Sequence, residues 1–150
     1  MRVSIRSWIA SAASTPSLVT LRTDIHQDMV ACAVLRGQLI RLSSEAAVTL
    51  HMAFHELATN AAKYGVLSTA DSALGVDCKL DDATSPATIE IVWTEQGGPP
   101  VTLPSRRGFG SNLLEIGLAQ EFGGATKLRF EPNGLICEMR FALSAKFEAP

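Results

Sequence analysis

The chain has little of what marks disulfide-bonded, zinc-binding, membrane-spanning or strongly charged proteins. It contains only 3 cysteines in 150 residues, and these lie far apart without a CxxC or Cys/His pairing, which argues against a disulfide framework and against zinc. No apolar run reaches the roughly 20 residues that cross a bilayer. With 13 basic and 15 acidic residues the net charge is −2, so we expect neither nucleic acid nor a membrane surface as partner. Reduced thiols and a cytoplasmic location fit best.

Enough apolar sequence remains for one folded unit. Hydrophobic residues make up 47% of the chain, which allows a buried core at the length of a single domain. Residues 1–13 carry two arginines and no acid and superficially resemble a targeting peptide, but their apolar part is short and interrupted by serine. We interpret them as the end of something truncated. The expected organisation is a residual segment over 1–15, one domain over 16–145 and a tail over 146–150.

Apolar spacing and capping residues predict three helices. They cover residues 16–27, 44–64 and 111–122. The second has a start signal at Ser43 or Ser44 and no proline or glycine before Gly65, which suits a C-terminal cap.

Alternating apolar residues and turn signals predict strands. One hairpin is expected from 74–80 and 88–94, and a second from 126–130 and 135–143. The stretches over 30–35 and 39–42 are read as extended, although the first also suits a helix. Together these elements predict an α+β fold, a two-layer α/β sandwich with a mixed, mostly antiparallel sheet covered on one face by helices.

The helix predicted over 44–64 is amphipathic, with unusual chemistry on its polar face. A helical wheel places its apolar side chains on one side, namely Leu50, Phe54, Leu57, Ala61 and Tyr64. Glu56, Asn60 and Lys63 cluster on the other side, where they could simply form a solvated face. Asparagine is unfavourable inside a helix, however, because its side chain competes for the hydrogen bonds of the backbone. Its presence at position 60 therefore suggests a functional role.

Binding of Mg²⁺ and phosphate supplies such a reason. The amide oxygen of Asn60 can ligate Mg²⁺ while triphosphate oxygens and water fill the other positions. Glu56, one turn earlier, can act as a general base or orient a nucleophile. Lys63, one turn later, can neutralise phosphate charge.

Two glycine-rich segments follow. Glu95 ends the strand predicted over 88–94 and stands just before Gly97 and Gly98. Glycine allows a ligand to approach the backbone, and the carboxylate can accept a hydrogen bond from an exocyclic amine such as that of adenine. A plain turn with a surface glutamate is the alternative.

The second segment places Arg106, Arg107, Gly108 and Gly110 at the start of the helix predicted over 111–122. Free N–H groups at a helix start and adjacent arginines can bind phosphate oxygens, although Arg106 is equally well read as a solvated loop residue. A lone Gly-x-Gly is weak evidence. The segment lacks the third glycine of a dinucleotide fold and the Gly-Lys-Ser/Thr ending of a P-loop, so neither nucleotide fold is supported.

The three motifs in this order resemble the Bergerat-type ATP-binding domain of histidine kinases and gyrase. His55 directly before Glu56, together with Trp93-x-Glu95, resembles the HWE family of sensor histidine kinases, and the likeness extends over roughly residues 16–143.

The resemblance implies particular roles in binding ATP and Mg²⁺. Asn60 would hold Mg²⁺, Glu56 would assist phosphoryl transfer, and Glu95 would take the place of the aspartate that related kinases use against adenine. Gly108 and Gly110 would contact the phosphates. Lys63, Gly97 and Arg107 join the predicted ATP site on physical grounds. His55 and Trp93 are expected to pack near the site without catalytic roles.

Sensor kinases also carry a dimerisation helix pair with the phosphoacceptor histidine, and neither His26 nor His51 resembles such an acceptor. The expected function is therefore transfer of the ATP γ-phosphate to a histidine on an acceptor dimerisation domain supplied elsewhere, with a response regulator downstream. A nucleotide-binding adaptor without turnover is one alternative. An anti-sigma-type serine kinase is another, which the His-Glu and Trp-x-Glu features disfavour.

Overall fold

The computed structural model describes residues 3–4, 32–37, 41–69, 72–100, 109–144 and 147–148. The helix predicted over 16–27 lies outside these residues. Arg106, Arg107 and Gly108 also lie outside them.

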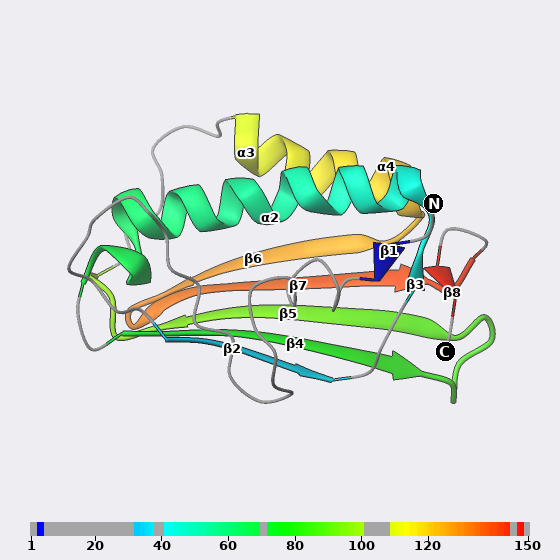
Figure 1. Ribbon diagram of the computed structural model, residues 1–150, viewed down its shortest axis with the longest axis horizontal. Coiled ribbons are helices and arrows are strands. Elements are labelled where there is room, and N and C mark those ends of the chain that lie inside the picture. Colours follow the sequence, from blue (N-terminus) through cyan, green and yellow to red (C-terminus); the bar gives the residue numbers. More distant parts are fainter. Residues whose placement is uncertain are drawn as a thin grey trace.

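A five-stranded sheet is the base of the structure (Figure 1). In spatial order its strands are β2 (Cys32–Gly37), β4 (Ala73–Asp81), β5 (Thr88–Gln96), β7 (Gly134–Ala142) and β6 (Ala125–Glu131). β2 runs parallel to β4, and every other neighbouring pair in this sheet is antiparallel. Both predicted hairpins, β4–β5 and β6–β7, and the mixed, mostly antiparallel sheet are therefore confirmed.

A second, small sheet joins residues near both ends of the chain. β3 (Arg41–Leu42) pairs antiparallel with β1 (Val3–Ser4) on one side and with β8 (Phe147–Glu148) on the other. Strand pairing was not predicted for either end. The domain boundaries placed near 15 and 145 stay a prediction.

The long helix α2 (Ser44–Tyr64) matches the predicted range. The Ser43 side chain accepts a hydrogen bond from the Ala46 amide, which satisfies one of the free N–H groups of the first turn. Gly65 follows its last residue, donating its amide to the Ala61 carbonyl. The chain then enters a short 3₁₀ turn, η1 (Val66–Ser68).

The second helical segment consists of α3 (Phe109–Asn112), a π-helical turn η2 (Leu113–Gly117) and α4 (Leu118–Phe122). It starts at Phe109 instead of the predicted Ser111. Gly123 ends it with a φ of 65°, the left-handed conformation that glycine adopts most easily. The predicted end at Phe122 is thus confirmed, whereas the π turn was not foreseen.

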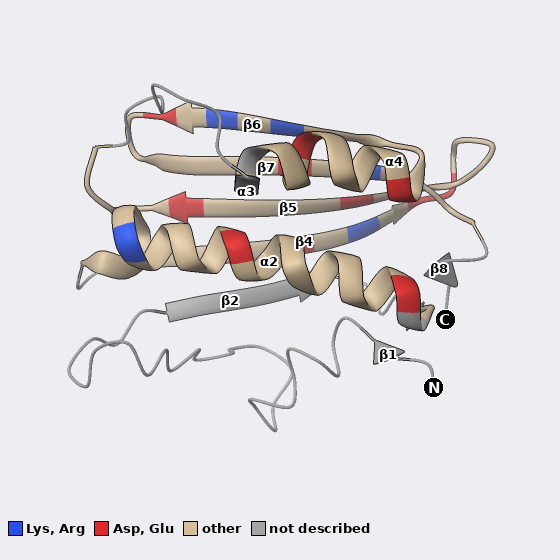
Figure 2. Cartoon of the chain, turned by 90° about the horizontal axis from the view of Figure 1, so that it is seen from above, with Lys and Arg blue, Asp and Glu red and all other residues tan. Residues whose placement is uncertain are grey.

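Both helical segments pack on the same face of the sheet, where they lie side by side (Figures 1 and 2). The core between the layers comes from α2, from η2 and α4, and from the inward residues of the strands. The buried helical residues are Ala46, Leu50, Ala53, Phe54, Leu57, Ala61, Leu114, Leu118 and Phe122. Those of the sheet are Leu74, Val76, Cys78, Ile89, Ile91, Trp93, Leu135, Cys137, Met139 and Phe141. The predicted two-layer sandwich is confirmed.

Tyr64 is the exception on the apolar side of α2. It is 74% exposed, although the helical wheel groups it with side chains that are buried. Tyr64 is the last residue of α2, and the buried Val66 and Leu67 of η1 fill the core just beyond it.

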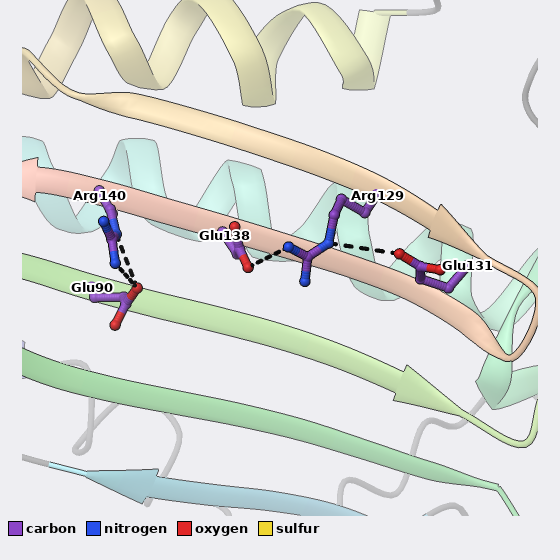
Figure 3. A network of polar contacts seen from close by, with 5 residues as sticks. All are labelled: Glu90, Arg129, Glu131, Glu138 and Arg140. Atoms are coloured by element: carbon purple, nitrogen blue, oxygen red, sulfur yellow. Dashed lines mark hydrogen bonds and ion pairs between the residues drawn. The ribbon is translucent and has the colours of Figure 1, made fainter.

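The opposite face of the sheet carries ion pairs (Figure 3). Arg140 on β7 donates to Glu90 on β5 at 2.7 Å. Arg129 on β6 lies with its Nη1 atom 2.9 Å from Glu138 Oε1 and with its Nε atom 3.7 Å from Glu131 Oε1.

No helix in the described part of the chain combines the length and the apolar character needed to cross a membrane.

Candidate functional site

The polar face of α2 presents three of the predicted site residues. Glu56 is half-buried, whereas Asn60 and Lys63 are exposed. Because successive members stand about one helical turn apart, they form a row along the helix. No described residue makes a side-chain hydrogen bond or ion pair with Glu56 or Asn60.

Gly110 brings the second helical segment against this row. A Cβ atom placed on Gly110 would lie 2.9 Å from Glu56 Oε2 and 3.8 Å from Asn60 Nδ2. The backbone at the start of α3 thus adjoins the carboxylate and the amide that the sequence selected. We call Glu56, Asn60 and Gly110 the Asn60 face. Two predicted motifs that are distant in the chain meet there.

The chemistry of the Asn60 face fits a cation bound together with an anionic ligand. No group of three or more His, Cys, Asp or Glu side chains among the described residues is placed to hold a metal ion by itself. One amide oxygen from Asn60 suits Mg²⁺, which usually keeps several waters and takes oxygens from substrate phosphates. An all-protein metal cage is not required.

The Gly97-Gly98 loop lies at the C-terminal end of α2. A Cβ atom on Gly98 would lie 2.9 Å from both Cα and N of Val66, so a side chain would push the loop away from η1. Gly97 has a φ of 81°, and its carbonyl accepts a hydrogen bond from Thr69 Oγ1 at 3.4 Å. The close approach to Val66 explains the glycine at 98, and the positive φ explains the glycine at 97.

Glu95 occupies a buried position between the sheet and the end of α2. The residue is 4% exposed. Trp93 Nε1 donates to Oε1 at 2.9 Å and the Val66 amide donates to Oε2 at 3.2 Å. The reading of Glu95 as an ordinary surface glutamate is therefore wrong.

Burial raises the pKa of the Glu95 carboxyl above its ordinary value, because desolvation disfavours the charged form. The two N–H donors, from Trp93 and Val66, act in the opposite direction and lower this pKa. The carboxyl is thus held by directed contacts in an environment that penalises its charge.

Two further glycines enclose Glu95. A Cβ atom on Gly65 would collide with Glu95 Oε2 and lie 3.0 Å from the Cα atom of Ala61. One on Gly134, whose φ is 147°, would collide with the Glu95 carbonyl. We call Trp93, Glu95, Gly65, Val66 and Gly134 the Glu95 corner.

The sequence predicted a cap at Gly65, but neither the approach of Gly65 and Gly134 to Glu95 nor the bond from Trp93 to Glu95 was foreseen. Trp93 was expected only to pack, which it also does, with its ring centroid 6.3 Å from that of Phe54. A signal for the bond was present, since residues two apart on a strand face the same side.

His55 is exposed on α2, and its ring stacks on that of His51 with centroids 6.2 Å apart. This places it outside the core. Arg107 and Gly108 belong to the segment outside the described residues, so their predicted phosphate contacts stay predictions.

The chain is similar to curated proteins named blue-light-activated histidine kinase. The relative from Brucella ovis is 32% identical over 131 residues, which are 87% of this chain and 25% of the relative. The relative from Brucella anthropi is 33% identical over 109 residues, which are 73% of this chain and 22% of the relative. The chain thus spans about a quarter of the length of the curated relatives it matches. No protein-family model matches the chain.

Solved structures share the fold. The histidine kinase domain of the blue-light activated histidine kinase from Erythrobacter litoralis EL346 superimposes with a TM-score of 0.61 at 15% identity, covering 81% of this chain and 54% of that one. The nucleotide-free catalytic domain of histidine kinase ThkA gives a TM-score of 0.51 at 13% identity, covering 72% of this chain and 76% of that one.

The architecture is therefore that of a histidine-kinase catalytic domain. Among histidine kinases, the His-Glu and Trp-x-Glu motifs indicate the HWE type. The sequence relatives and the fold together support the predicted HWE-type histidine-kinase ATP-binding domain.

Proposed function

We propose that this chain binds Mg²⁺-ATP and catalyses transfer of the γ-phosphate to a protein histidine. The observation that carries the proposal is the Asn60 face, where Gly110 lies against Glu56 and Asn60. A helix start without a side chain, a carboxylate and a cation-binding amide are thereby gathered at one place. This combination suits a nucleoside triphosphate with its bound Mg²⁺.

Each residue of the Asn60 face has a distinct task in this proposal. Asn60 offers its amide oxygen to Mg²⁺, which when bound neutralises charge on the phosphate oxygens. Gly110 lets the backbone at the start of α3 approach the phosphates because no side chain intervenes. Glu56, half-buried beside both, orients the incoming nucleophile or accepts its proton.

Lys63 and the glycine loops extend the site along α2. Lys63 is exposed near the C-terminal end of the helix and supplies a mobile positive charge for phosphate. Arg107 and Gly108 precede Gly110 in the chain and are proposed as further phosphate contacts. Gly97 and Glu95 mark the base end of the site, where the sequence predicts a contact between Glu95 and adenine.

The acceptor and the rest of the pathway are part of the proposal. We infer that the phosphate passes to the histidine of an acceptor dimerisation domain and from there to a response regulator, in the cytoplasm. The adaptor alternative differs in one respect, since an adaptor binds nucleotide and transfers nothing.

A transfer assay separates these functions. The protein is titrated with Mg²⁺-ATP by calorimetry, and a purified acceptor domain is then added with γ-labelled ATP. We expect label on the acceptor histidine. Binding without transfer to any acceptor tested would favour the adaptor, and absence of binding would refute both functions.

Asn60→Ala and Asn60→Asp test the metal role. Both should weaken nucleotide binding in the presence of Mg²⁺ by roughly tenfold, the loss of one good polar contact to a charged group, and should change binding in EDTA much less. Equal affinities of variant and wild type in Mg²⁺ would refute the role of Asn60.

A further inference from the structure

His51 and His55 form a pair of imidazoles on α2 that the proposed nucleotide site does not use. They stand one helical turn apart, and both residues are exposed. Their rings stack with an angle of 26° between the planes and 6.2 Å between the centroids. Two nitrogen heterocycles are thus gathered on one solvent-exposed side of the helix.

The distance between the two rings matches what one metal ion can span. Because zinc binds a ring nitrogen at about 2.0 Å, and that nitrogen lies about 1.2 Å from the ring centre, two rings on one ion have centroids up to about 6.4 Å apart. The 6.2 Å between His51 and His55 falls within this limit. Rotation of the two side chains can therefore aim a nitrogen of each ring at a shared ion without moving α2, and histidines four residues apart on a helix bind zinc in this way.

The chemistry of the pair selects the metal. Imidazole nitrogen suits zinc, nickel and copper ions, whereas Mg²⁺ prefers oxygen ligands. No group of three or more His, Cys, Asp or Glu side chains is placed to hold a metal in the described part of the chain, so water would fill the remaining positions around the ion. The pair thus offers an open, two-histidine site.

This pair lies away from the Asn60 face. On a helical wheel the two histidines are about 40° apart, whereas Asn60 lies about 140° from His55 and about 180° from His51. An ion held by the histidines and the Mg²⁺ of the proposed function would therefore occupy different sides of α2.

We propose that His51 and His55 form a chelating site for a divalent transition-metal ion of the zinc, nickel and copper group. One ring nitrogen of each histidine ligates the ion, which bridges two successive turns of α2. Binding stabilises the folded protein, because the unfolded chain does not hold the two imidazoles at this spacing. The site goes beyond the proposed function and does not depend on nucleotide.

Calorimetric titration of nucleotide-free protein with Zn²⁺ and with Ni²⁺ tests the site in wild type, His51→Gln, His55→Gln and the double variant. Wild type should bind a single ion at this site. Each single substitution should raise its Kd by roughly a hundredfold, because the remaining imidazole loses the high effective concentration of the second. The double variant should be little worse than either single one, since both substitutions break the same chelate.

Met52→Leu is the matched control. Met52 lies beside His51 and is itself 44% exposed, so this change alters the same surface and keeps both imidazoles. Its Kd for Zn²⁺ should equal that of wild type. The order of affinities is a further signature of imidazole ligation, with Cu²⁺ bound more tightly than Ni²⁺ or Zn²⁺ and Mg²⁺ unable to displace any of them.

Thermal unfolding gives a second readout. Saturating Zn²⁺ should raise the Tm of wild type by several degrees and that of either single variant much less. In EDTA all variants should unfold with wild type, because both histidines are exposed, which separates loss of the metal site from loss of the fold.

Equal Kd values for wild type and the single variants would overturn the inference, and so would a wild type that binds Zn²⁺ no more tightly than the double variant. Failure to bind Mg²⁺-ATP would overturn the proposed function and leave the metal site standing.

Discussion

The Glu95 corner and the Asn60 face lie along the same helix in contrasting surroundings. At the C-terminal end of α2, Glu95 is buried, hydrogen-bonded at both oxygens and enclosed by glycines. Further toward the N-terminus, Asn60 is exposed and no described side chain pairs with it or with Glu56. The described residues complete the polar contacts of the first region themselves, whereas in the proposed function a ligand completes those of the second.

This difference predicts that substitutions will separate stability from binding. Changes in the Glu95 corner should lower both the stability of the fold and the affinity for nucleotide, because its polar groups already bond to one another. Changes on the Asn60 face should lower the affinity for nucleotide alone.

Gly134→Ala should give the largest loss of stability. The new methyl group would collide with the Glu95 carbonyl, and the residue would have to keep a φ of 147°. We expect the free energy of unfolding to fall by roughly 3 kcal/mol or more, from overpacking and backbone strain together. Urea titration at neutral pH measures it.

Gly123→Ala is the matched control for Gly134→Ala. Gly123 also has a positive φ, of 65°, but among the described residues beyond its chain neighbours no atom lies within 4 Å of the point that its Cβ atom would occupy, so strain alone should cost about 1 kcal/mol. Equal losses for the two variants would show that the contact with Glu95 is unimportant.

Stability should also depend on pH through Glu95. Because burial raises its pKa, the folded state binds this proton more tightly than the unfolded state. The stabilisation by protonation is complete below the ordinary pKa of glutamate and is lost as pH rises through the raised pKa. Wild type should therefore lose stability relative to Glu95→Gln over that interval.

Thermal unfolding of both proteins across the acidic to neutral range tests this pH dependence. Asn60→Ala removes no titrating group and should follow wild type. A constant difference between wild type and Glu95→Gln at all pH values would contradict the pKa shift.

Gly110→Ala sharpens the comparison from the other side. Its methyl group would lie 2.9 Å from Glu56 Oε2, and the half-buried carboxylate can move aside, so we expect a stability change below about 1 kcal/mol. Nucleotide affinity should fall several-fold, because the methyl occupies the approach to the backbone.

Gly117→Ala, in the same helical segment, is the control for Gly110→Ala. Its methyl would lie 3.2 Å from Leu113 Cδ1, a side chain of the same helical segment and away from the Asn60 face, so affinity should stay at the wild-type value. If both variants lost affinity equally, the Asn60 face would not be the phosphate site.

Asn60→Ala should have the smallest effect on stability. Alanine is the better helix former by about 0.5 kcal/mol, and Asn60 has no described side-chain partner to lose. Denaturant unfolding should show an unchanged or slightly higher stability, and a loss above about 1 kcal/mol would mean that Asn60 supports the fold.

Local sequence signals predicted the elements well because their causes are local. The cap at Ser43, the stop at Gly65 and the left-handed Gly123 depend on neighbouring residues, so α2 and the end of α4 could be placed. The hairpins followed from alternation and turn residues. The π turn over Leu113–Gly117 had no such signal.

The sequence allowed the main residues of the Asn60 face to be predicted, but not the residues that surround Glu95. Helical spacing alone groups Glu56 and Asn60, although only the fold brings Gly110 to them. The burial of Glu95 depends on Val66, 29 residues earlier, and on the close approach of Gly134. Contacts between distant segments leave no periodic trace in the sequence.

The ion pairs on the face of the sheet opposite the helices bear on how copies of the chain meet. β6 is an edge strand of the five-stranded sheet, so one side of its backbone has no partner strand among the described residues. Lys127, Arg129 and Glu131 alternate along it on the face opposite the helices. Charges so placed oppose the docking of a second β6 against this edge. Arg129 and Glu131, which pair with each other in Figure 3, belong to this charged edge strand.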